Sequence, residues 1–285
     1  MIRLCITADD YGLSGDVNAA IHSLVKRGAL SAVSVMVHGD AVLEQVAALR
    51  PYVATGLHLV LVGERPLLPD RLAPLLDAAG FLPASYWRLF LALARRPLLL
   101  PLLGDEIAAQ LARYRALGLP LHFINSHQHV HLLPPIWNQM MRTLASADSA
   151  APAVRIAHRA PTGGPRQTLL AASSRLAWTM HPLRGRTALV AIGVDFAGYT
   201  TLRDVDDVLR CLARTSDLPD TRFVYELVVH PGFEDHPPAA RHGAWRYRWR
   251  GEHDLLSSSE FRELLRRHAV VVVRPDAPAG PTRSS

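Results

Sequence analysis

The sequence has few cysteines and almost no lysine, and each shortage argues against a class of protein. Cys5 and Cys211 are the only two cysteines in 285 residues and stand far apart, so we expect neither a disulfide scaffold nor a pair of thiolate ligands. Lys26 is the single lysine among 31 basic residues, and the arginines are interleaved with acidic residues without a basic block. The net charge of +6 therefore does not indicate binding to nucleic acid, and we expect none.

Long apolar runs are missing as well. The first residues, MIRLCITADD, lack the apolar stretch of a secretory signal, and no run of about 18 apolar residues occurs. We expect a cytoplasmic protein, with peripheral contact at the inner face of the membrane as an alternative. Hydrophobic residues make up 49% of the chain, enough for a large buried core. Residues 276–285, rich in proline, glycine and serine, are predicted to be a disordered tail, which leaves residues 1–275 as a single domain.

Short apolar, β-branched runs alternate with longer helical patterns along the whole chain. The predicted strands are Arg3–Thr7, Ala32–Val37, Ala54–Val62, His122–Asn125, Ala153–Ile156, Val190–Val194, Phe223–Val229 and Val270–Val273. The predicted helices are Asp16–Arg27, Ala41–Leu49, Gly104–Leu117, Pro135–Ala145, Leu202–Arg214 and Ser259–His268. This alternation predicts an α/β fold, namely a (β/α) barrel of the TIM type with seven or eight strands and some irregularity. In such a barrel the catalytic groups lie at the carboxyl ends of the strands.

Polar residues follow several predicted strands at their carboxyl ends. Asp9 and Asp10 directly follow the first strand, and two adjacent carboxylates repel each other unless a cation or a proton compensates them. His58 lies near the end of the third strand, and His230 begins a stiff His-Pro-Gly turn after the seventh. The alternatives are a solvated turn for the aspartates and a hydrogen-bonded core histidine for His58.

The segment NSHQHVH, residues 125–131, is the strongest single feature. His127, His129 and His131 recur at a period of two and can share a face if the chain is extended. We expect one to bind a metal while the others hold it or the substrate, and the sequence leaves open which partner His129 and His131 contact. One carboxylate and two imidazoles would leave open positions on a divalent ion, with Zn²⁺ favoured and Mg²⁺, Mn²⁺, Fe²⁺ and Co²⁺ as alternatives.

Four motifs in fixed order carry a family resemblance. TADDYG, GLHLVL, SHQHVH and ELVVHPG resemble those of the YdjC/ChbG-like carbohydrate deacetylases, over about Arg3 to Val273. The stretch Gly56–Pro69 is most similar to the hopanoid-biosynthesis deacetylases of the HpnK type. The resemblance implies a metal-dependent N-deacetylase built on a (β/α) barrel. It also implies Asp9 as general base and His230 as general acid, and the metal ligands that it implies are Asp10, His58 and His127.

The hopanoid branch implies a lipid-linked substrate. This would be an N-acetylglucosaminyl group on bacteriohopanetetrol, which deacetylation converts to the free glucosamine. Soluble N-acetylated sugars such as chito-oligosaccharides are one alternative, and a barrel phosphoesterase with the same ligands is another. A metal- or lipid-binding module without catalysis is the non-enzymatic alternative.

Three further features are candidates for contact with substrate or membrane. The apolar stretch Trp87–Leu103 predicts an amphipathic helix packed on the barrel, or a peripheral membrane contact whose arginines meet lipid headgroups. The aromatic residues Trp245, Tyr247 and Trp249 alternate with arginines and are candidates for stacking on a sugar ring, or simply part of an exposed strand or loop. Arg155 is a candidate to contact the substrate or to orient a catalytic carboxylate. Nothing in the sequence indicates an oligomeric state.

Overall fold

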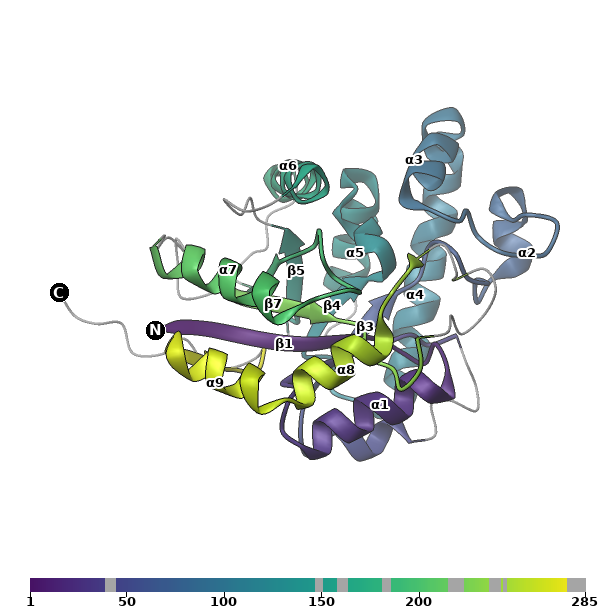
Figure 1. The fold of residues 1–285 in the computed structure, drawn as a ribbon. Coiled ribbons are helices and arrows are strands. Elements are labelled where there is room, and N and C mark those ends of the chain that lie inside the picture. Colours follow the sequence, from purple (N-terminus) through teal and green to yellow (C-terminus); the bar gives the residue numbers. More distant parts are fainter. Residues whose placement is uncertain are drawn as a thin grey trace.

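The structure is a computed structural model, and it describes residues 1–38, 45–146, 151–157, 164–180, 186–214, 223–235, 242 and 245–275. Strands and helices alternate along these residues (Figure 1). The strands are β1 (Ile2–Tyr11), β2 (Ala32–Val35), β3 (Ala54–Leu59), β4 (Phe123–Ser126), β5 (Ala153–Ala157), β6 (Ala188–Ile192), β7 (Phe223–Val229) and β8 (Val270–Val272). The α-helices are α1 (Gly15–Lys26), α2 (Pro69–Leu72), α3 (Tyr86–Arg95), α4 (Leu100–Ala116), α5 (Pro134–Ser146), α6 (Pro165–Met180), α7 (Leu202–Arg214), α8 (Trp249–Ser257) and α9 (Ser259–Arg267). Short 3-10 turns are η1 (Val46–Leu49), η2 (Ala73–Leu75), η3 (Pro97–Leu99) and η4 (His127–Leu132).

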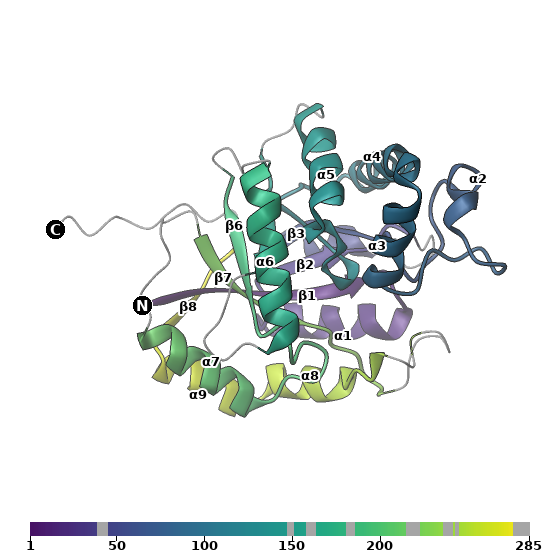
Figure 2. The ribbon, with the colours of Figure 1, turned by 90° about the horizontal axis from the view of Figure 1, so that it is seen from above.

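Seven strands close into a barrel because β1 has hydrogen-bonded neighbours on both sides. The parallel order is β2-β3-β4-β5-β6-β7-β1, and β1 also pairs with β2. The short β8 pairs with residues 2–4 at the start of β1, whereas β2 pairs with residues 7–11 further along. The predicted (β/α) barrel is confirmed, with seven strands in the closed ring and an eighth beside it. Helices surround the ring (Figures 1 and 2).

An apolar layer inside the barrel lies below the polar residues. Each of the seven strands contributes one buried side chain to it, namely Cys5, Ala32, Ala54, Phe123, Ala153, Leu189 and Val224. Most are small, which leaves room for the ring of Phe123; at Gly56 an added Cβ would lie 2.6 Å from that ring. Burial, then the charge of Glu226, raises the pKa of the Cys5 thiol to about 12, so this cysteine is a neutral packing residue.

The next inward position on several strands is polar. Because side chains alternate along a strand, the residue two positions beyond an inward one points inward as well. On five strands this residue is buried and polar, namely Thr7, Ser34, Asn125, Arg155 and Glu226. The alternation therefore places a polar layer directly above the apolar one, toward the carboxyl ends of the strands.

The outer helices pack an apolar stripe on the barrel. In α7, for example, Val205, Val208, Leu209 and Leu212 are buried at helical spacing. Ser14 caps α1 by accepting a hydrogen bond from the Val17 amide at 3.2 Å.

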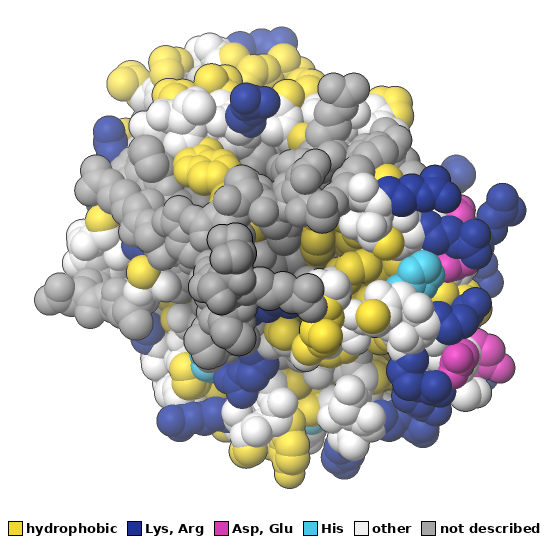
Figure 3. All heavy atoms as spheres, turned by 90° about the vertical axis from the view of Figure 1, so that its left-hand side faces the viewer, with side chains coloured by type: hydrophobic (Ala, Val, Ile, Leu, Met, Phe, Trp, Pro, Cys, Tyr) yellow, Lys and Arg dark blue, Asp and Glu magenta, His cyan; other side chains and the backbone are white. Residues whose placement is uncertain are grey.

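The amino terminus lies at the end of the barrel opposite the carboxyl ends of the strands. Seen from that end, basic side chains gather along one edge of the molecule and are mixed with acidic ones (Figure 3).

The predicted elements are mostly present, with different ends. The predicted helix Ala41–Leu49 falls partly outside the described residues, and its described part is the 3-10 turn Val46–Leu49. The tail 276–285 also lies outside them. Three described helices were not predicted, the short α2 together with α6 and α8, and α6 carries apolar residues on its exposed as well as its buried side. Among the described residues no helix is both long and apolar enough to cross a membrane.

Between β3 and β4 the chain leaves the barrel. This excursion contains α2, α3 and α4, and α2 and α3 project beyond the end at which β1 finishes (Figures 1 and 2). The predicted amphipathic stretch Trp87–Leu103 is not one helix, because the chain leaves helical geometry at Arg96, before Pro97. Leu89 and Leu93 of α3 are buried, whereas Trp87, Phe90 and Leu91 are exposed.

Candidate active site

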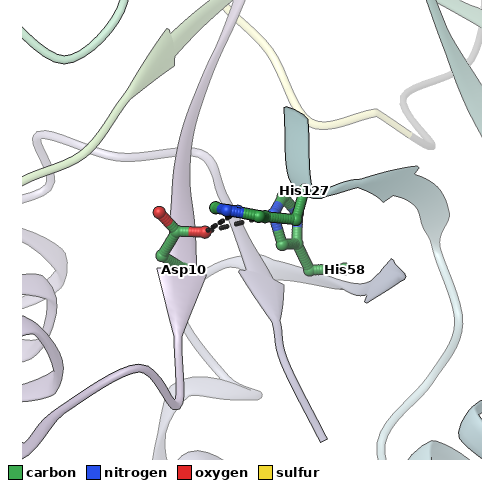
Figure 4. Close-up of side chains that lie close together, drawn as sticks. All are labelled: Asp10, His58 and His127. Atoms are coloured by element: carbon green, nitrogen blue, oxygen red, sulfur yellow. Dashed lines mark hydrogen bonds and ion pairs between the residues drawn. The ribbon is translucent and has the colours of Figure 1, made fainter. Parts of the chain in front are cut away.

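Asp10, His58 and His127 meet at the carboxyl end of the barrel (Figure 4). The Asp10 Oδ1 atom lies 3.1 Å from His58 Nε2 and 3.2 Å from His127 Nδ1. One ligand atom from each of the three residues lies within 4.8 Å of the other two, and all three side chains are buried. The histidines come from β3 and from the residue after β4, which are paired neighbours, whereas Asp10 comes from β1, which is separated from β3 by β2, so the curvature of the barrel brings the three together.

A β-bulge explains how neighbouring aspartates can both serve the site. Between Ala8 and Tyr11 strand β1 advances three residues while its partner β2 advances two, so β1 carries one extra residue. Asp10 has a φ of 64°, in the left-handed region that a non-glycine residue seldom adopts. The bulge turns Asp10 toward His58 and His127 while Asp9 keeps the inward direction set by Thr7.

The donor set fits a divalent cation. Asp10 Oδ2, His58 Nε2 and His127 Nε2 are buried atoms without a hydrogen-bond partner, as expected of groups that complete a coordination sphere. Burial would raise the pKa of the Asp10 carboxyl, but His127 and His58 hold it well below its usual range, so Asp10 is ionised. Two imidazoles and one carboxylate are the ligands that zinc and similar ions accept.

Hydrogen bonds fix the ring of His58. Its Nδ1 atom lies 2.7 Å from Asn125 Oδ1 and 2.8 Å from Ser34 Oγ. The Asn125 amide nitrogen donates to Asp9 Oδ1 at 3.1 Å, which sets the amide oxygen toward His58. Nδ1 therefore carries the proton, and Nε2 keeps a lone pair for a metal. Asn125 thus connects a candidate ligand with the neighbouring carboxylate.

Arg155 holds Asp9 in a buried charge network. Its guanidinium donates to both Asp9 oxygens, at 2.6 and 2.9 Å, and to both Glu226 oxygens, at 2.7 and 2.9 Å. Thr7 Oγ1 donates to Glu226 Oε1 at 2.7 Å. Burial would raise the pKa of Asp9, but Arg155 and then His58 lower it, so Asp9 is a carboxylate that can accept a proton. Arg155 is fully buried with these donors engaged, a placement that favours orienting a carboxylate over touching substrate.

One divalent cation would balance the charges of this network. Asp9, Asp10 and Glu226 are three buried carboxylates, and Arg155 is the one buried guanidinium among them. Two negative charges remain, which is the charge that one divalent ion neutralises. Because an uncompensated buried charge costs several kcal/mol, this balance is independent support for a divalent site.

The turn after His127 is strained and firmly attached. Gln128 and His129 have φ values of 52° and 57°, so two consecutive residues are left-handed. The Gln128 side chain accepts from the Tyr86 amide at 3.3 Å and donates to the Ala84 carbonyl at 3.1 Å, which joins this turn to the start of α3. His131 contacts the Ser126 hydroxyl and, through Nε2, the Arg155 carbonyl at 2.9 Å.

His129 and His131 therefore differ. The hydrogen bonds of His131 are both to protein, and burial lowers its pKa to about 3, so it is a neutral structural residue that braces the turn. His129 is buried, and its Nδ1 atom has no hydrogen-bond partner. Burial, with Arg155 next in effect, holds the pKa of His129 well below its usual range. Neither residue belongs to the group of possible ligands found in the described residues.

Aromatic rings line the other side of the site. The Trp245 ring lies 4.7 Å from that of His127, and the Tyr247 ring lies 4.6 Å from that of His230, measured between centroids. Gly198, with a φ of 96°, makes room for Tyr247, since an added Cβ would lie 2.2 Å from its ring. Trp249, the first residue of α8, is buried and lies behind this wall.

Four buried polar residues of the site were not predicted. Asn125 and Glu226 stood inside recognised segments without an assigned role, and Ser34 and Glu252 were not singled out at all. A charged residue inside the apolar strand Phe223–Val229 was a readable signal, because Glu226 and His230 share a period of two. Glu252 carried no such signal, since it lies in an unpredicted helix.

The chain matches a known protein family over nearly its whole length. A family model described as YdjC-like protein covers residues 3–267, which include every segment that forms the site. The chain belongs to the YdjC-like family. The resemblance seen in the four motifs is thereby confirmed, whereas the closer likeness to the HpnK type stays a prediction.

Relatives of this YdjC-like protein have deacetylase names. The carbohydrate deacetylase of Mus musculus is 30% identical, over 94% of this chain and 92% of the mouse protein. The chitooligosaccharide deacetylase of Serratia marcescens is 34% identical, over 47% of this chain and 52% of its own. A structure from Enterococcus faecalis V583, described as a cellobiose-phosphate cleavage protein, has a TM-score of 0.70 at 19% identity and covers 98% of this chain and 99% of its own. This last likeness concerns the fold alone.

Proposed function

We propose that this YdjC-like protein is a metal-dependent N-deacetylase of an amino sugar. The observation that carries the proposal is the pairing of two different carboxylates at one bulge. Asp10 faces His58 and His127 in a group fit to bind a divalent ion, while Asp9 is kept out of that group by Arg155. A deacetylase needs both a Lewis acid and a separate base, and relatives named carbohydrate deacetylases support the reaction class.

The chain's own residues have complementary tasks in this reaction. A divalent ion held by Asp10, His58 and His127 would polarise the acetamide carbonyl and lower the pKa of water at the site from about 15.7 toward about 7. Asp9, fixed and ionised by Arg155, accepts a proton from the water that attacks the carbonyl carbon. His230 lies at the end of β7 and donates a proton to the departing amine. Acetate and the free amino sugar are the products.

The substrate is, in this proposal, a sugar linked to a lipid. The N-acetylglucosaminyl group of a bacteriohopanetetrol lipid is the candidate, on the sequence likeness of Gly56–Pro69. The ring faces of Trp245 and Tyr247 lie beside His127 and His230, where they could stack on a sugar. Trp249 is buried behind them and would support the wall from behind rather than touch the sugar. Arg155, by its contacts, would position Asp9 rather than bind substrate.

A membrane contact through α3 would suit such a substrate. Trp87, Phe90 and Leu91 are exposed on one side of α3, and Leu98 is exposed just beyond it. Arg88, Arg95 and Arg96 are exposed near them, the combination that an anionic lipid surface favours. Gln128 joins the start of α3 to the turn that carries His127, so the apolar face lies close to the site.

Acetate release tests the function directly. The purified protein, loaded in turn with Zn²⁺, Mg²⁺, Mn²⁺, Fe²⁺ and Co²⁺, is assayed with an N-acetylglucosaminyl hopanoid and with a chito-oligosaccharide of matched sugar. We expect acetate and a new free amine from the hopanoid with at least one metal, and none without metal. Release from the chito-oligosaccharide alone would place the substrate among soluble sugars. Phosphate release from sugar phosphates with no acetate from either substrate would contradict the deacetylase.

A further inference from the structure

Glu252 is a fully buried carboxylate that joins two loops at the carboxyl end of the barrel. It lies in the first turn of α8 and accepts hydrogen bonds from the backbone amides of Gly198 at 3.0 Å and Thr200 at 2.9 Å, and from the Thr200 hydroxyl. Its other oxygen accepts from the backbone amide of His230. One side chain therefore fixes the loop after β6 and the end of β7 to each other.

The same carboxylate faces the ring of His230. Glu252 Oε2 lies 3.9 Å from His230 Nδ1, and this nitrogen is buried without a hydrogen-bond partner. A buried ring nitrogen that lacks a partner is costly, and the Glu252 carboxylate beside it could accept its proton. The Tyr247 ring packs against the His230 ring, with 4.6 Å between the centroids, and limits its rotation.

The turn after His230 is also built around α8. The Gly232 amide donates to the Trp249 carbonyl at 3.0 Å, and an added Cβ on Gly232 would lie 2.8 Å from Trp249 Cβ. The start of α8 therefore holds the backbone both at His230 and at Gly232. The 3.9 Å between Glu252 Oε2 and His230 Nδ1 is longer than a hydrogen bond, so a bond between these atoms needs a small rotation of the ring.

A buried carboxylate that binds backbone amides is not by itself functional, and Glu106 is the comparison. Glu106 is also fully buried, and it accepts from the amides of Leu67 and Leu68, each at 2.9 Å. Its bonds stabilise the excursion after β3 and involve no residue of the proposed chemistry. Glu252 differs because its third amide partner is His230, whose ring lies in the site.

We propose that Glu252 is a positioning residue for His230. It accepts the Nδ1 proton of the imidazole, so that Nε2 is the nitrogen presented to the departing amine. This assignment rests on the proposed deacetylase function for its role in turnover, although the orientation of the ring does not. A carboxylate that fixes the tautomer of a catalytic histidine is a recurrent arrangement among hydrolases.

A double-mutant cycle with the metal-loaded enzyme tests the role. Glu252→Gln should lower kcat by about tenfold or more with little change in KM or in bound metal. In a His230→Ala background the same substitution should lower kcat by less than about twofold, because there is no ring left to position. Glu106→Gln is the matched control, and it should lower the melting temperature without changing the kcat of folded enzyme.

Nuclear magnetic resonance gives a readout that does not depend on turnover. Imidazole nitrogen shifts, with His230→Ala for assignment, should show His230 protonated at Nδ1 in the wild type and as a mixture of tautomers in Glu252→Gln. If Glu252→Gln does not fold, Glu252→Asp, which keeps the charge but is one methylene shorter, should change both the tautomer and kcat in the same direction.

Unchanged tautomers would overturn the proposal, as would a loss in kcat that is equally large with and without His230. A tautomer change in a protein that releases no acetate would support the role of Glu252 and contradict the deacetylase.

Discussion

Two neighbouring aspartates have different surroundings although they have the same chemistry. Asp10 meets imidazoles that lack other partners, whereas Asp9 meets a guanidinium and an amide that already hold it. An ion pair with Arg155 keeps Asp9 ionised and fixes both of its oxygens. The same pair makes Asp9 a poor candidate for a metal ligand, since its lone pairs are largely occupied. The difference in role follows from the contacts of each carboxylate and not from its position in the sequence.

Replacing each aspartate should therefore have a different effect. Asp9→Asn should keep about one equivalent of bound metal and lower kcat by roughly 100-fold or more, because the amide cannot accept the proton. Asp10→Asn should lose both metal and turnover. Metal content by mass spectrometry of the desalted protein, alongside acetate release, separates the two. Near-normal turnover in a folded Asp9→Asn protein would show that another group is the base.

At the residue scale, the sequence pointed to the candidate ligands and acid–base residues more clearly than to the residues that hold them in place by hydrogen bonds. The site residues with a titrating side chain at a strand end could be read from the chain, because a parallel barrel gathers its strand ends. Ser34, Asn125 and Glu252 could not, since what matters about them is which atom each one contacts. The bulge at Asp10 was equally hidden, because it depends on pairing with β2.

At the scale of elements, the strands were predicted well, as was α4 at the end of the excursion between β3 and β4, whereas the part of that excursion before α4 was predicted poorly. Buried strands of a parallel barrel are short apolar runs, so their positions are plain even where their ends are not. The stretch Trp87–Leu103 combines apolar residues with two prolines, and its apolar residues do not all face the core. In the structure Leu89 and Leu93 pack inward while Phe90 and Leu91 face outward, so hydrophobicity alone could not place the helix.

The exposed side of α3 leads to a prediction about lipid. Phe90→Glu with Leu91→Glu should weaken binding to vesicles containing anionic lipid by about tenfold or more, because two apolar anchors become charged. Leu176→Glu is the matched control, since Leu176 is an exposed leucine on α6. Co-sedimentation with vesicles measures binding, and deacetylation of a soluble substrate should be the same in all three proteins. Equal binding by the variants at α3 and α6 would remove α3 as the contact.

At the scale of the whole molecule, the barrel is closed around a site that carries excess negative charge. The charge network joins β1, β5 and β7, and the candidate ligands come from β1, β3 and the end of β4. A substitution that breaks this network should therefore weaken the closure of the ring as well as the chemistry of the site. The alternation of strands and helices predicted the barrel but not this buried charge network, since a barrel can close without any charge inside it.

Metal should consequently stabilise the fold and not only support turnover. A ligand that binds only the native state stabilises it by about 4 kcal/mol at a thousand times its dissociation constant. For a chain of this size that corresponds to a rise in melting temperature of roughly 10 °C. Calorimetry of the chelated and the zinc-loaded protein measures the shift.

Asp10→Asn should abolish the rise in melting temperature, because that substitution removes a ligand together with one of the charges that the cation offsets. Arg71→Ala is the control that should keep the full shift, because Arg71 lies in an exposed ion pair with Asp105 and is not one of the candidate ligands. If chelation leaves the melting temperature of the wild type unchanged, the two excess charges must be neutralised by protonation, and the group of Asp10, His58 and His127 does not bind a divalent ion tightly.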